Sequence, residues 1–398
     1  MAVHVLSLTG TKLADGLIDP KLVLSWLLVA LGAPAAFVGL LVPIREAGAL
    51  LPQLFTAATI RSLPVRKWVW AVGSGVQGLC AIGMGLAAWR LDDTAAGLAI
   101  LALLAVLALA RSVCSVAYKD VLGKTVERAR RGRATGLASS LAAAGVLIFA
   151  LVLASGFVPK PVLVPIALGL AGALWIGAAM LFATLGEVPG ATEGGGSAFR
   201  TALRHLSWLI SDRPLRRFIG VRALLTATAL APPFMVAHAG SVTGGSGYGG
   251  LGFLVFASAM AGLLSSYVWG RLADVSSRQV LVASGATGGI ALAATVIAGG
   301  TGVIGLPGVL PALLFVLMIA YQGVRLGRST HLVDMATEET RAGYTALSNT
   351  FIGLVLLAGG AFSLLAMAFG TGAVLATMAL MCLLAVPLGL GLDEVQTD

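Results

Sequence analysis

The chain has 398 residues, of which 58% are hydrophobic and only 11% are charged, and its mean hydropathy is +0.97. An apolar content this high excludes a soluble domain built around one core, and it predicts an all-α membrane protein with many spans. The net charge of +9 includes no basic cluster interleaved with aromatic residues, so we expect no nucleic-acid partner.

Apolar stretches of membrane-spanning length recur along nearly the whole chain, and they predict twelve transmembrane helices. The first six cover approximately 22–43, 47–62, 68–89, 94–117, 134–157 and 162–185. The second six cover approximately 217–239, 250–269, 280–300, 306–326, 343–368 and 372–391. The first hairpin has the weakest pattern, because Arg45 and Glu46 interrupt its apolar run.

The residues ahead of the first predicted span are too polar for a secretory signal, because Lys12, Asp15 and Asp19 break up their apolar run. We expect these residues to form a cytoplasmic N-terminal segment. With the N-terminus inside, the basic residues concentrate in the cytoplasmic loops, as they do in other helical membrane proteins. The sequence therefore predicts that both termini are cytoplasmic and that the protein lies in a bacterial-type inner membrane.

The longest polar stretch, 186–216, is predicted to be a central cytoplasmic loop. It separates an N-terminal six-helix half, 1–185, from a C-terminal six-helix half, 217–398. Apolar residues spaced by three or four from 198 to 210 predict an amphipathic helix on the membrane surface within this loop.

The two halves also repeat each other. A shift of 210 residues aligns the loop and helix start after the fourth span of each half. The same shift places Arg61 on Arg271, and one extra residue places Lys67 on Arg278. A repeat of this kind predicts a duplicated, pseudo-symmetric bundle, which is how many transporters build a central site that opens alternately to each side.

A short charged loop separates two apolar spans in the second half. Its sequence resembles the signature between the second and third helices of each half in the major facilitator superfamily of secondary transporters. The matching residues are Gly270, Leu272, Ala273, Asp274 and Arg278, whereas Ser277 and Gln279 depart from the pattern and Leu281 comes one position early. The twelve spans and the central loop extend this resemblance over nearly the full chain.

The resemblance implies that charges in this loop latch the halves together on the cytoplasmic side. The second-half residues of the latch would be Gly270, Arg271, Asp274 and Arg278, and the first-half residues would be Arg61 and Lys67. Asp274 would accept hydrogen bonds from Arg271, Arg278 or a helix N-terminus. Because the first-half loop has bases but no acid, we expect an asymmetric latch centred on Asp274. A solvated loop that only orients its helices is the alternative.

Ionisable residues within the spans are candidates for a substrate cavity, because charge at membrane depth is costly. Arg111 and Arg222 fall in the fourth and seventh spans, where they could bind planar anions or extend to the interface. Glu46 is either a proton acceptor in the outer cavity or an exposed turn residue. The other acids fall in predicted loops and termini, so no deep carboxylate relay is expected.

Neutral polar and aromatic residues are further candidates for the cavity, although such residues also hold membrane helices together. They are Trp26, Gln53, Gln77, Tyr321, Gln322, Tyr344 and Asn349. The three cysteines and four histidines have neither metal-ligand spacing nor an arrangement for catalysis. We therefore expect no metal, no cofactor and no enzymatic activity.

These observations and the resemblance predict a secondary active transporter that moves a small organic solute by alternating access. Proton-coupled export or exchange is the preferred mechanism, and facilitated diffusion is the nearest variant. We expect a monomer in the lipid bilayer, with a small molecule and protons as its partners. A receptor or assembly factor that keeps the fold without transporting anything is the alternative from another class.

Overall fold

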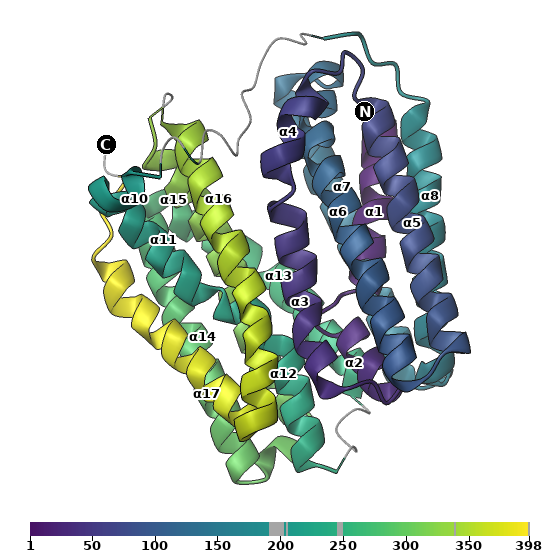
Figure 1. Cartoon of the computed structure of the whole chain (residues 1–398), viewed down its shortest axis with the longest axis vertical. Coiled ribbons are helices and arrows are strands. Elements are labelled where there is room, and N and C mark those ends of the chain that lie inside the picture. The colour runs from purple at the N-terminus through teal and green to yellow at the C-terminus, as the bar shows by residue number, and fades with distance from the viewer. Residues whose placement is uncertain (191–202, 204–205, 245–249, 338–339, 397–398) are drawn as a thin grey trace. The chain divides into compact units, whose positions relative to one another are not determined.

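The structure, a computed structural model, describes residues 1–190, 203, 206–244, 250–337 and 340–396. The chain is 85% helical, so the predicted all-α class is confirmed. It forms two compact units (Figure 1). The first comprises Met1–Phe37 and Ile44–Arg200, and the second comprises Val38–Pro43 and Thr201–Asp398.

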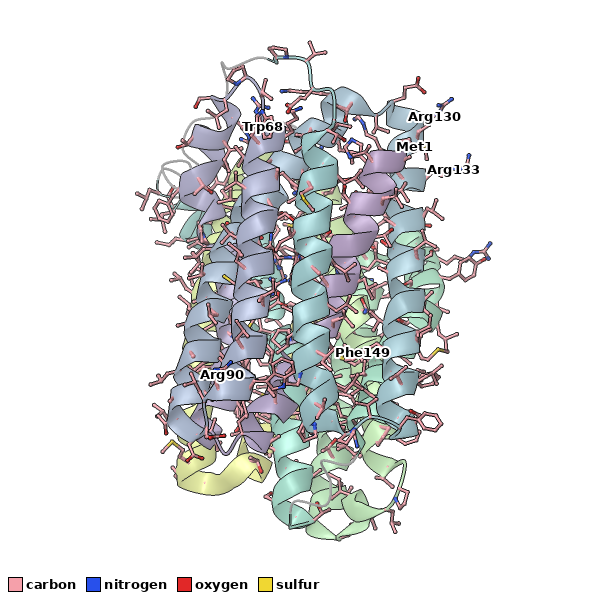
Figure 2. The ribbon with its side chains drawn as sticks, turned by 90° about the vertical axis from the view of Figure 1, so that its right-hand side faces the viewer. Met1, Trp68, Arg90, Arg130, Arg133 and Phe149 are labelled. Carbon is pink, nitrogen blue, oxygen red and sulfur yellow. The ribbon has the colours of Figure 1, made fainter. Side chains whose placement is uncertain are left out.

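The first unit is a bundle whose helices pack along one another. Its helices are α1 (Ala2–Leu17), α2 (Val23–Ala30), α3 (Ala35–Leu50, of which Val38–Pro43 belongs to the second unit), α4 (Gln53–Arg61), α5 (Lys67–Arg90), α6 (Asp93–Thr125), α7 (Arg128–Ser155) and α8 (Lys160–Ala183). In this unit α1 packs on α7 and α8, and α5 packs on α6 and α8. Figure 2 shows Met1, Trp68, Arg130 and Arg133 at one end, which we call the Met1 end, and Arg90 towards the other.

The second unit has a corresponding set of helices. They are α10 (Trp208–Ser211), α11 (Arg213–Leu225), α12 (Ala227–Val242), α13 (Leu251–Val275), α14 (Ser277–Gly300), α15 (Val309–Asp334), α16 (Arg341–Ala358) and α17 (Phe362–Leu390), with short 3₁₀ turns at Val303–Gly305 and Gly359–Ala361. A kink interrupts α17 at Gly370, whose φ of +82° suits a residue without a side chain.

The helix boundaries follow the shift of 210 residues found in the sequence. Lys67–Arg90 of α5 maps onto Ser277–Gly300 of α14, residue for residue at both ends. The neighbours correspond as well, because α14 packs on α15 and α17 as α5 packs on α6 and α8. The repeat is therefore visible in the helices themselves and in their pairings.

Ten helical stretches in the described part of the chain are long and apolar enough to cross a membrane. One of them, Gly343–Leu390, has 48 residues, whereas one crossing needs only about 20. The helices α1 and α2 are not among the ten. The chain is thus an integral, multi-pass membrane protein.

Two expectations about the N-terminal region are wrong. The residues ahead of Lys21 were expected to form a segment outside the spans, but Ala2–Leu17 is the helix α1 and packs against α7 and α8. The predicted span 22–43 crosses a turn between α2 and α3, where Gly32 has a φ of +76°. Apolar residues on both sides of this turn made two helices look like one.

Two other predicted segments differ in extent. The loop Gly270–Leu281 is almost entirely helical, because α13 continues to Val275 and α14 begins at Ser277. Ser276 alone separates the two helices, and its hydroxyl caps α14 by accepting from the Gln279 N–H at 3.1 Å. Most of the amphipathic helix predicted over 198–210 lies outside the described residues.

Candidate functional site

Three ionisable residues lie along the N-terminal helix and the turn that follows it. Lys12 and Asp15 lie on α1, and Asp19 lies in the turn that leads into α2. Spacings of three and four residues place side chains on the same side of a helix. Because α1 is part of the bundle, these charges lie among helices rather than in a solvated segment.

The carboxylate of Asp15 lies between two arginines from other helices. Arg45, on α3, donates from Nη2 to Oδ1 at 2.8 Å, and Arg111, on α6, donates from Nη1 to Oδ2. The side chains of Arg45 and Asp15 are only 11% and 21% exposed, whereas that of Arg111 is 36% exposed. We call these three residues the Asp15 cluster; their formal charge is +1, since one acid faces two bases.

Two members of the Asp15 cluster, Asp15 and Arg111, line a cavity of about 160 Å³ within the first unit. Its polar lining consists of Thr11, Lys12, Asp15, Gln77, Arg111, Ser115 and Tyr118, beside the indoles of Trp70 and Trp175. A cavity with convergent polar groups on an apolar frame is typical of a small-molecule site.

Gln77 contributes an unpaired acceptor to this region. Its Nε2 donates to the Gly73 carbonyl oxygen at 3.2 Å and contacts the Cys114 sulfur at 3.4 Å. Its Oε1 is buried and has no hydrogen-bond partner among the described residues. Of the predicted cavity residues, Arg111 and Gln77 therefore meet at one place.

Arg111 is deeper in its helix than the sequence analysis placed it. The fourth span, expected to end at 117, continues as α6 to Thr125. Arg111 thus lies about four turns before the end of α6. A charge so far from a helix end is costly unless an opposite charge lies beside it, and Asp15 pairs with both Arg111 and Arg45.

In the second unit, Arg222 and Asn349 lie together. Arg222, on α11, is only 5% exposed, and its Nη1 donates to the Ser348 hydroxyl of α16. Its Nη2 lies 3.5 Å from Oδ1 of Asn349. Its guanidinium carbon lies 5.7 Å from the centre of the Phe218 ring. Arg222 therefore does not extend to the interface but is held inside the unit.

The other predicted cavity residues have separate environments. Trp26 is buried in α2, and Gln53 donates to the Ala49 carbonyl oxygen at 2.6 Å. Tyr321 and Gln322 both contact Arg325, whose guanidinium lies 5.8 Å from the tyrosine ring centre and 3.4 Å from the glutamine Oε1. Two further residues complete the set: Glu46 lies on α3 next to Arg45, and the Tyr344 hydroxyl donates to Asp212.

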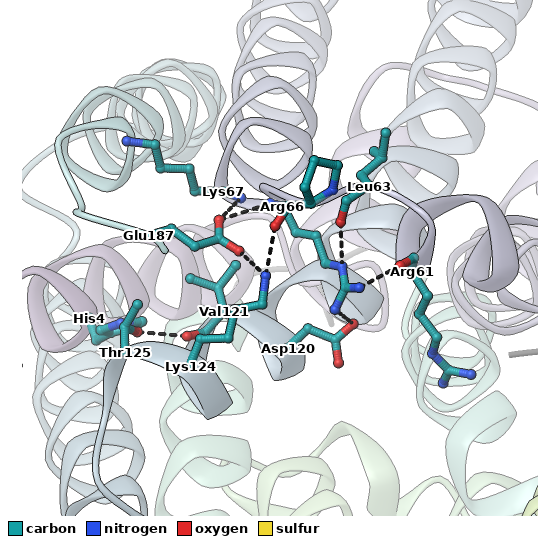
Figure 3. Close-up of polar contacts among 11 residues, drawn as sticks. His4, Arg61, Leu63, Arg66, Lys67, Asp120, Val121, Lys124, Thr125 and Glu187 are labelled. Atoms are coloured by element: carbon teal, nitrogen blue, oxygen red, sulfur yellow. Dashed lines mark hydrogen bonds and ion pairs between the residues drawn. The ribbon is translucent and has the colours of Figure 1, made fainter. Parts of the chain in front are cut away.

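At the Met1 end of the first unit, a buried carboxylate binds the start of α5 (Figure 3). Oε2 of Glu187 accepts from the backbone N–H groups of Arg66 and Lys67 at 2.8 and 2.7 Å. Its Oε1 pairs with Lys124 Nζ at 2.8 Å, and its side chain is fully buried. An acid at a helix N-terminus is stabilised by the orphan N–H groups there.

Arg66 and the predicted latch residues complete this network. Arg66 Nη1 pairs with Asp120 at 3.0 Å, and its Nη2 donates to the carbonyl oxygen of Arg61. The Arg61 side chain is exposed. Lys67 Nζ donates to the carbonyl oxygens of Ala183 and Leu185, at 2.9 and 2.6 Å. The first unit therefore supplies two acids to its bases, although the loop between α4 and α5 contains none.

In the second unit, Arg278 pairs with Glu394 rather than with Asp274. Arg278 Nε lies 3.3 Å from Glu394 Oε2, which also accepts from the Ser276 hydroxyl at 2.6 Å. Asp274 is exposed and forms no ion pair with another residue that the structure describes. Two other latch candidates lie on α13: Arg271 stacks 5.3 Å from the Tyr267 ring centre, and a side chain on Gly270 would meet open space.

Asp15 and Lys12 were not predicted as cavity residues, because both fall in an N-terminal segment that was expected to lie outside the spans. Their spacing on α1 was the available signal. Within the described residues, no group of three or more His, Cys, Asp and Glu could hold a metal ion. The chemistry open to the site is thus ion pairing, hydrogen bonding and proton transfer at a carboxylate.

No family model matches the sequence, and no curated protein matches it. Solved structures do match over nearly the full chain. A mutant of the nucleoside transporter NupG has a TM-score of 0.73 at 14% identity, covering 98% of this chain and 99% of that one. A D-xylose-proton symporter has a TM-score of 0.75 at 10% identity, covering 100% and 98%.

A POT family transporter in complex with a thioalcohol-conjugated peptide has a TM-score of 0.72 at 10% identity, covering 97% of this chain and 94% of that one. Sequence identities this low establish the fold alone. The chain therefore has the fold of these transporters, and the fold that the resemblance around Asp274 implied is confirmed.

Proposed function

We propose that the protein is a secondary active transporter that moves a small organic solute across the membrane by alternating access. The observation that carries this proposal is the Asp15 cluster, of which Asp15 and Arg111 line a polar cavity, inside a bundle with a transporter fold. Charges held at membrane depth usually mark a substrate or proton pathway, because their burial is costly.

We further propose twelve spans in two six-helix halves. The long stretch Gly343–Leu390 counts as two crossings separated near Gly370. The helices α1 and α2 together count as another, which packs in its unit as α11 and α12 do in theirs. The repeat of 210 residues supports this count. In this topology the central region 186–216 links the halves.

The proposed topology places both termini in the cytoplasm of a cell with a bacterial-type inner membrane. Arg130 and Arg133 lie at the Met1 end of the first unit (Figure 2). Bases at the ends of spans remain on the cytoplasmic side. The charge distribution therefore supports a cytoplasmic Met1 end.

Asp15 is our proposed proton acceptor. As a carboxylate it satisfies Arg45 and Arg111 together, and protonation would remove the charge that holds them. The arginines would then attract another anion or move apart, so that proton binding changes the packing of α1, α3 and α6. Proton-coupled export or exchange is the mechanism that we prefer. Glu46 remains the second candidate acceptor because it lies beside Arg45.

The proposal can be tested in proteoliposomes that contain a pH-sensitive dye. The panel of solutes comprises xylose, a nucleoside, a dipeptide and benzoate, and the readout is solute-dependent proton flux. We expect at least one solute to move protons through the wild type and Asp15→Asn to abolish that flux. Glu127→Gln is the matched control, because the Glu127 side chain is 75% exposed.

Each other result identifies an alternative. Proton flux lost in Glu46→Gln but kept in Asp15→Asn would transfer the coupling role to Glu46. Solute flux without proton flux would indicate a facilitated-diffusion uniporter. The absence of any solute flux through protein that remains folded would favour the non-transporting receptor or assembly factor.

A further inference from the structure

Arg222 carries a charge that its surroundings leave unbalanced. Its side chain is buried in the second unit, and no described acid forms an ion pair with it. Its contacts are neutral: a hydroxyl from Ser348, an amide oxygen from Asn349 and the face of the Phe218 ring.

The guanidinium also has unused donors. Two of its N–H groups meet Ser348 and Asn349, and the latter contact is long, at 3.5 Å. Its Nε is buried and has no hydrogen-bond partner among the described residues. A guanidinium offers five N–H donors in a fixed plane, so a planar two-oxygen acceptor can bind to the free edge.

The internal repeat gives this position a counterpart in the first unit. A shift of 210 residues places Lys12 on Arg222 and Ser139 on Asn349. In the first unit Lys12 Nζ donates to the Ser139 hydroxyl at 2.5 Å, and in the second unit Arg222 faces Asn349. Each unit therefore has a base, on α1 or on α11, that faces a polar group at the corresponding place on α7 or α16.

The two units differ in how they balance this base. Three residues after Lys12 the first unit has Asp15, whereas three residues after Arg222 the second unit has Leu225, which is fully buried among apolar side chains. The first unit therefore contains a carboxylate of its own at this level of the helix. The second unit keeps the base and lacks the acid, so its counter-charge has to come from elsewhere.

We propose that Arg222, with Ser348 and Asn349, binds the carboxylate group of a small organic anion. The free Nε edge of Arg222 and the amide of Asn349 would donate to the carboxylate oxygens, while Ser348 holds the guanidinium in place. A carboxylate fits better than a neutral group because it balances a buried charge as well as filling donors. The place of this anion as transported substrate rests on the proposed function, but its binding does not.

The test is a binding experiment on purified protein in detergent micelles, so it does not depend on transport. Acetate, benzoate and succinate are compared with acetamide, benzamide and succinamide at equal ionic strength, and the melting temperature is followed against concentration. We expect at least one acid to raise the melting temperature where its amide does not. Arg222→Gln should weaken the apparent affinity for that acid at least tenfold.

Two variants keep the result interpretable. Arg213→Gln is the matched control, because it removes an exposed arginine from the same helix and should leave acid binding unchanged. Arg222→Lys keeps the charge and should fold even where Arg222→Gln does not; it should weaken binding several-fold, since a lysine lacks the planar fork.

The proposal is overturned if no acid outperforms its amide in the wild type, or if Arg222→Gln and Arg222→Lys both bind the acid with the wild-type apparent affinity. A vesicle assay separates this inference from the proposed function. Transport of an amide as fast as its acid would refute carboxylate recognition and leave the transporter proposal standing. Acid binding without transport of any solute would support carboxylate recognition and refute the transporter proposal.

Discussion

Replacing Asp15 with asparagine removes the carboxylate that Arg45 and Arg111 share, and leaves two guanidinium groups inside the first unit. Removing one member of a buried ion pair costs about 3–5 kcal/mol, because the other charge remains desolvated. The Arg45 and Asp15 side chains are mostly but not fully buried, which favours the lower end of that range, about 3 kcal/mol.

The pair with Arg111 should contribute less. Its arginine is about one-third exposed and lies at the cavity, so water screens the interaction and its share is at most about 1 kcal/mol. An asparagine oxygen can still accept from one arginine, which recovers about 1 kcal/mol. We therefore expect Asp15→Asn to lower the free energy of unfolding by about 3 kcal/mol and Asp15→Ala to lower it by about 4 kcal/mol.

Equilibrium unfolding by SDS in mixed micelles measures these differences, and double-mutant cycles assign them to the two pairs. The cycle of Asp15→Asn with Arg45→Gln should give a coupling of about 2 kcal/mol, and the cycle with Arg111→Gln less than about 1 kcal/mol. Equal couplings for the two arginines would refute the argument from burial. If Asp15→Asn had the same free energy of unfolding as the wild type, the cluster would not be held together by charge.

Three further predictions concern packing and capping. Glu187→Gln should destabilise the protein by about 2 kcal/mol, because a fully buried acid loses its charge where two backbone N–H groups and a lysine bind it. Glu394→Gln should cost less, since the Glu394 side chain is 21% exposed. Equal losses of free energy in SDS unfolding would contradict this order. Gly78→Ala should lower the free energy of unfolding by about 1–3 kcal/mol, because the new Cβ would lie 2.7 Å from a backbone oxygen of α8. Gly75→Ala on the same helix places its Cβ in open space and should be neutral or slightly stabilising. Gly370→Ala should lower the free energy of unfolding by about 1–2 kcal/mol through backbone strain alone, since the φ of Gly370 is +82° and its Cβ would meet no atom within 4 Å. An unchanged melting temperature would mean that the kink relaxes.

Composition and the Asp274 motif were sufficient to predict the fold, because membrane helices must satisfy their own backbone and therefore leave long apolar runs in the sequence. The N-terminal helix was the exception. Hydropathy treats Lys12, Asp15 and Asp19 as breaks in an apolar run, yet their spacing of three and four residues is also that of a polar helix face. The partners that make this face tolerable, Arg45 and Arg111, come from helices far along the chain.

The repeat was more informative about the site than any single motif. In the sequence it is clearest in the loop after the fourth span. The structure extends it to α1 and α11, where Lys12 and Arg222 occupy corresponding positions. A sequence shift alone could not show that both bases face a polar group on α7 or α16. It also could not show that Arg222 is buried, because its helix begins in a polar, arginine-rich segment.

The residues that follow the last helix of each unit show why the composition of a loop does not reveal the charges that it meets. The loop ahead of α5 contains no acid, but Glu187, four residues beyond the end of α8, reaches the N-terminus of α5. In the second unit Gln396, six residues beyond the end of α17, accepts from the Ser277 N–H at the start of α14 at 2.9 Å, and Glu394 accepts from the Ser276 hydroxyl. A helix N-terminus requires acceptors wherever the chain can supply them. In both units the segment after the last helix supplies one, so a loop sequence cannot by itself reveal which charges it meets.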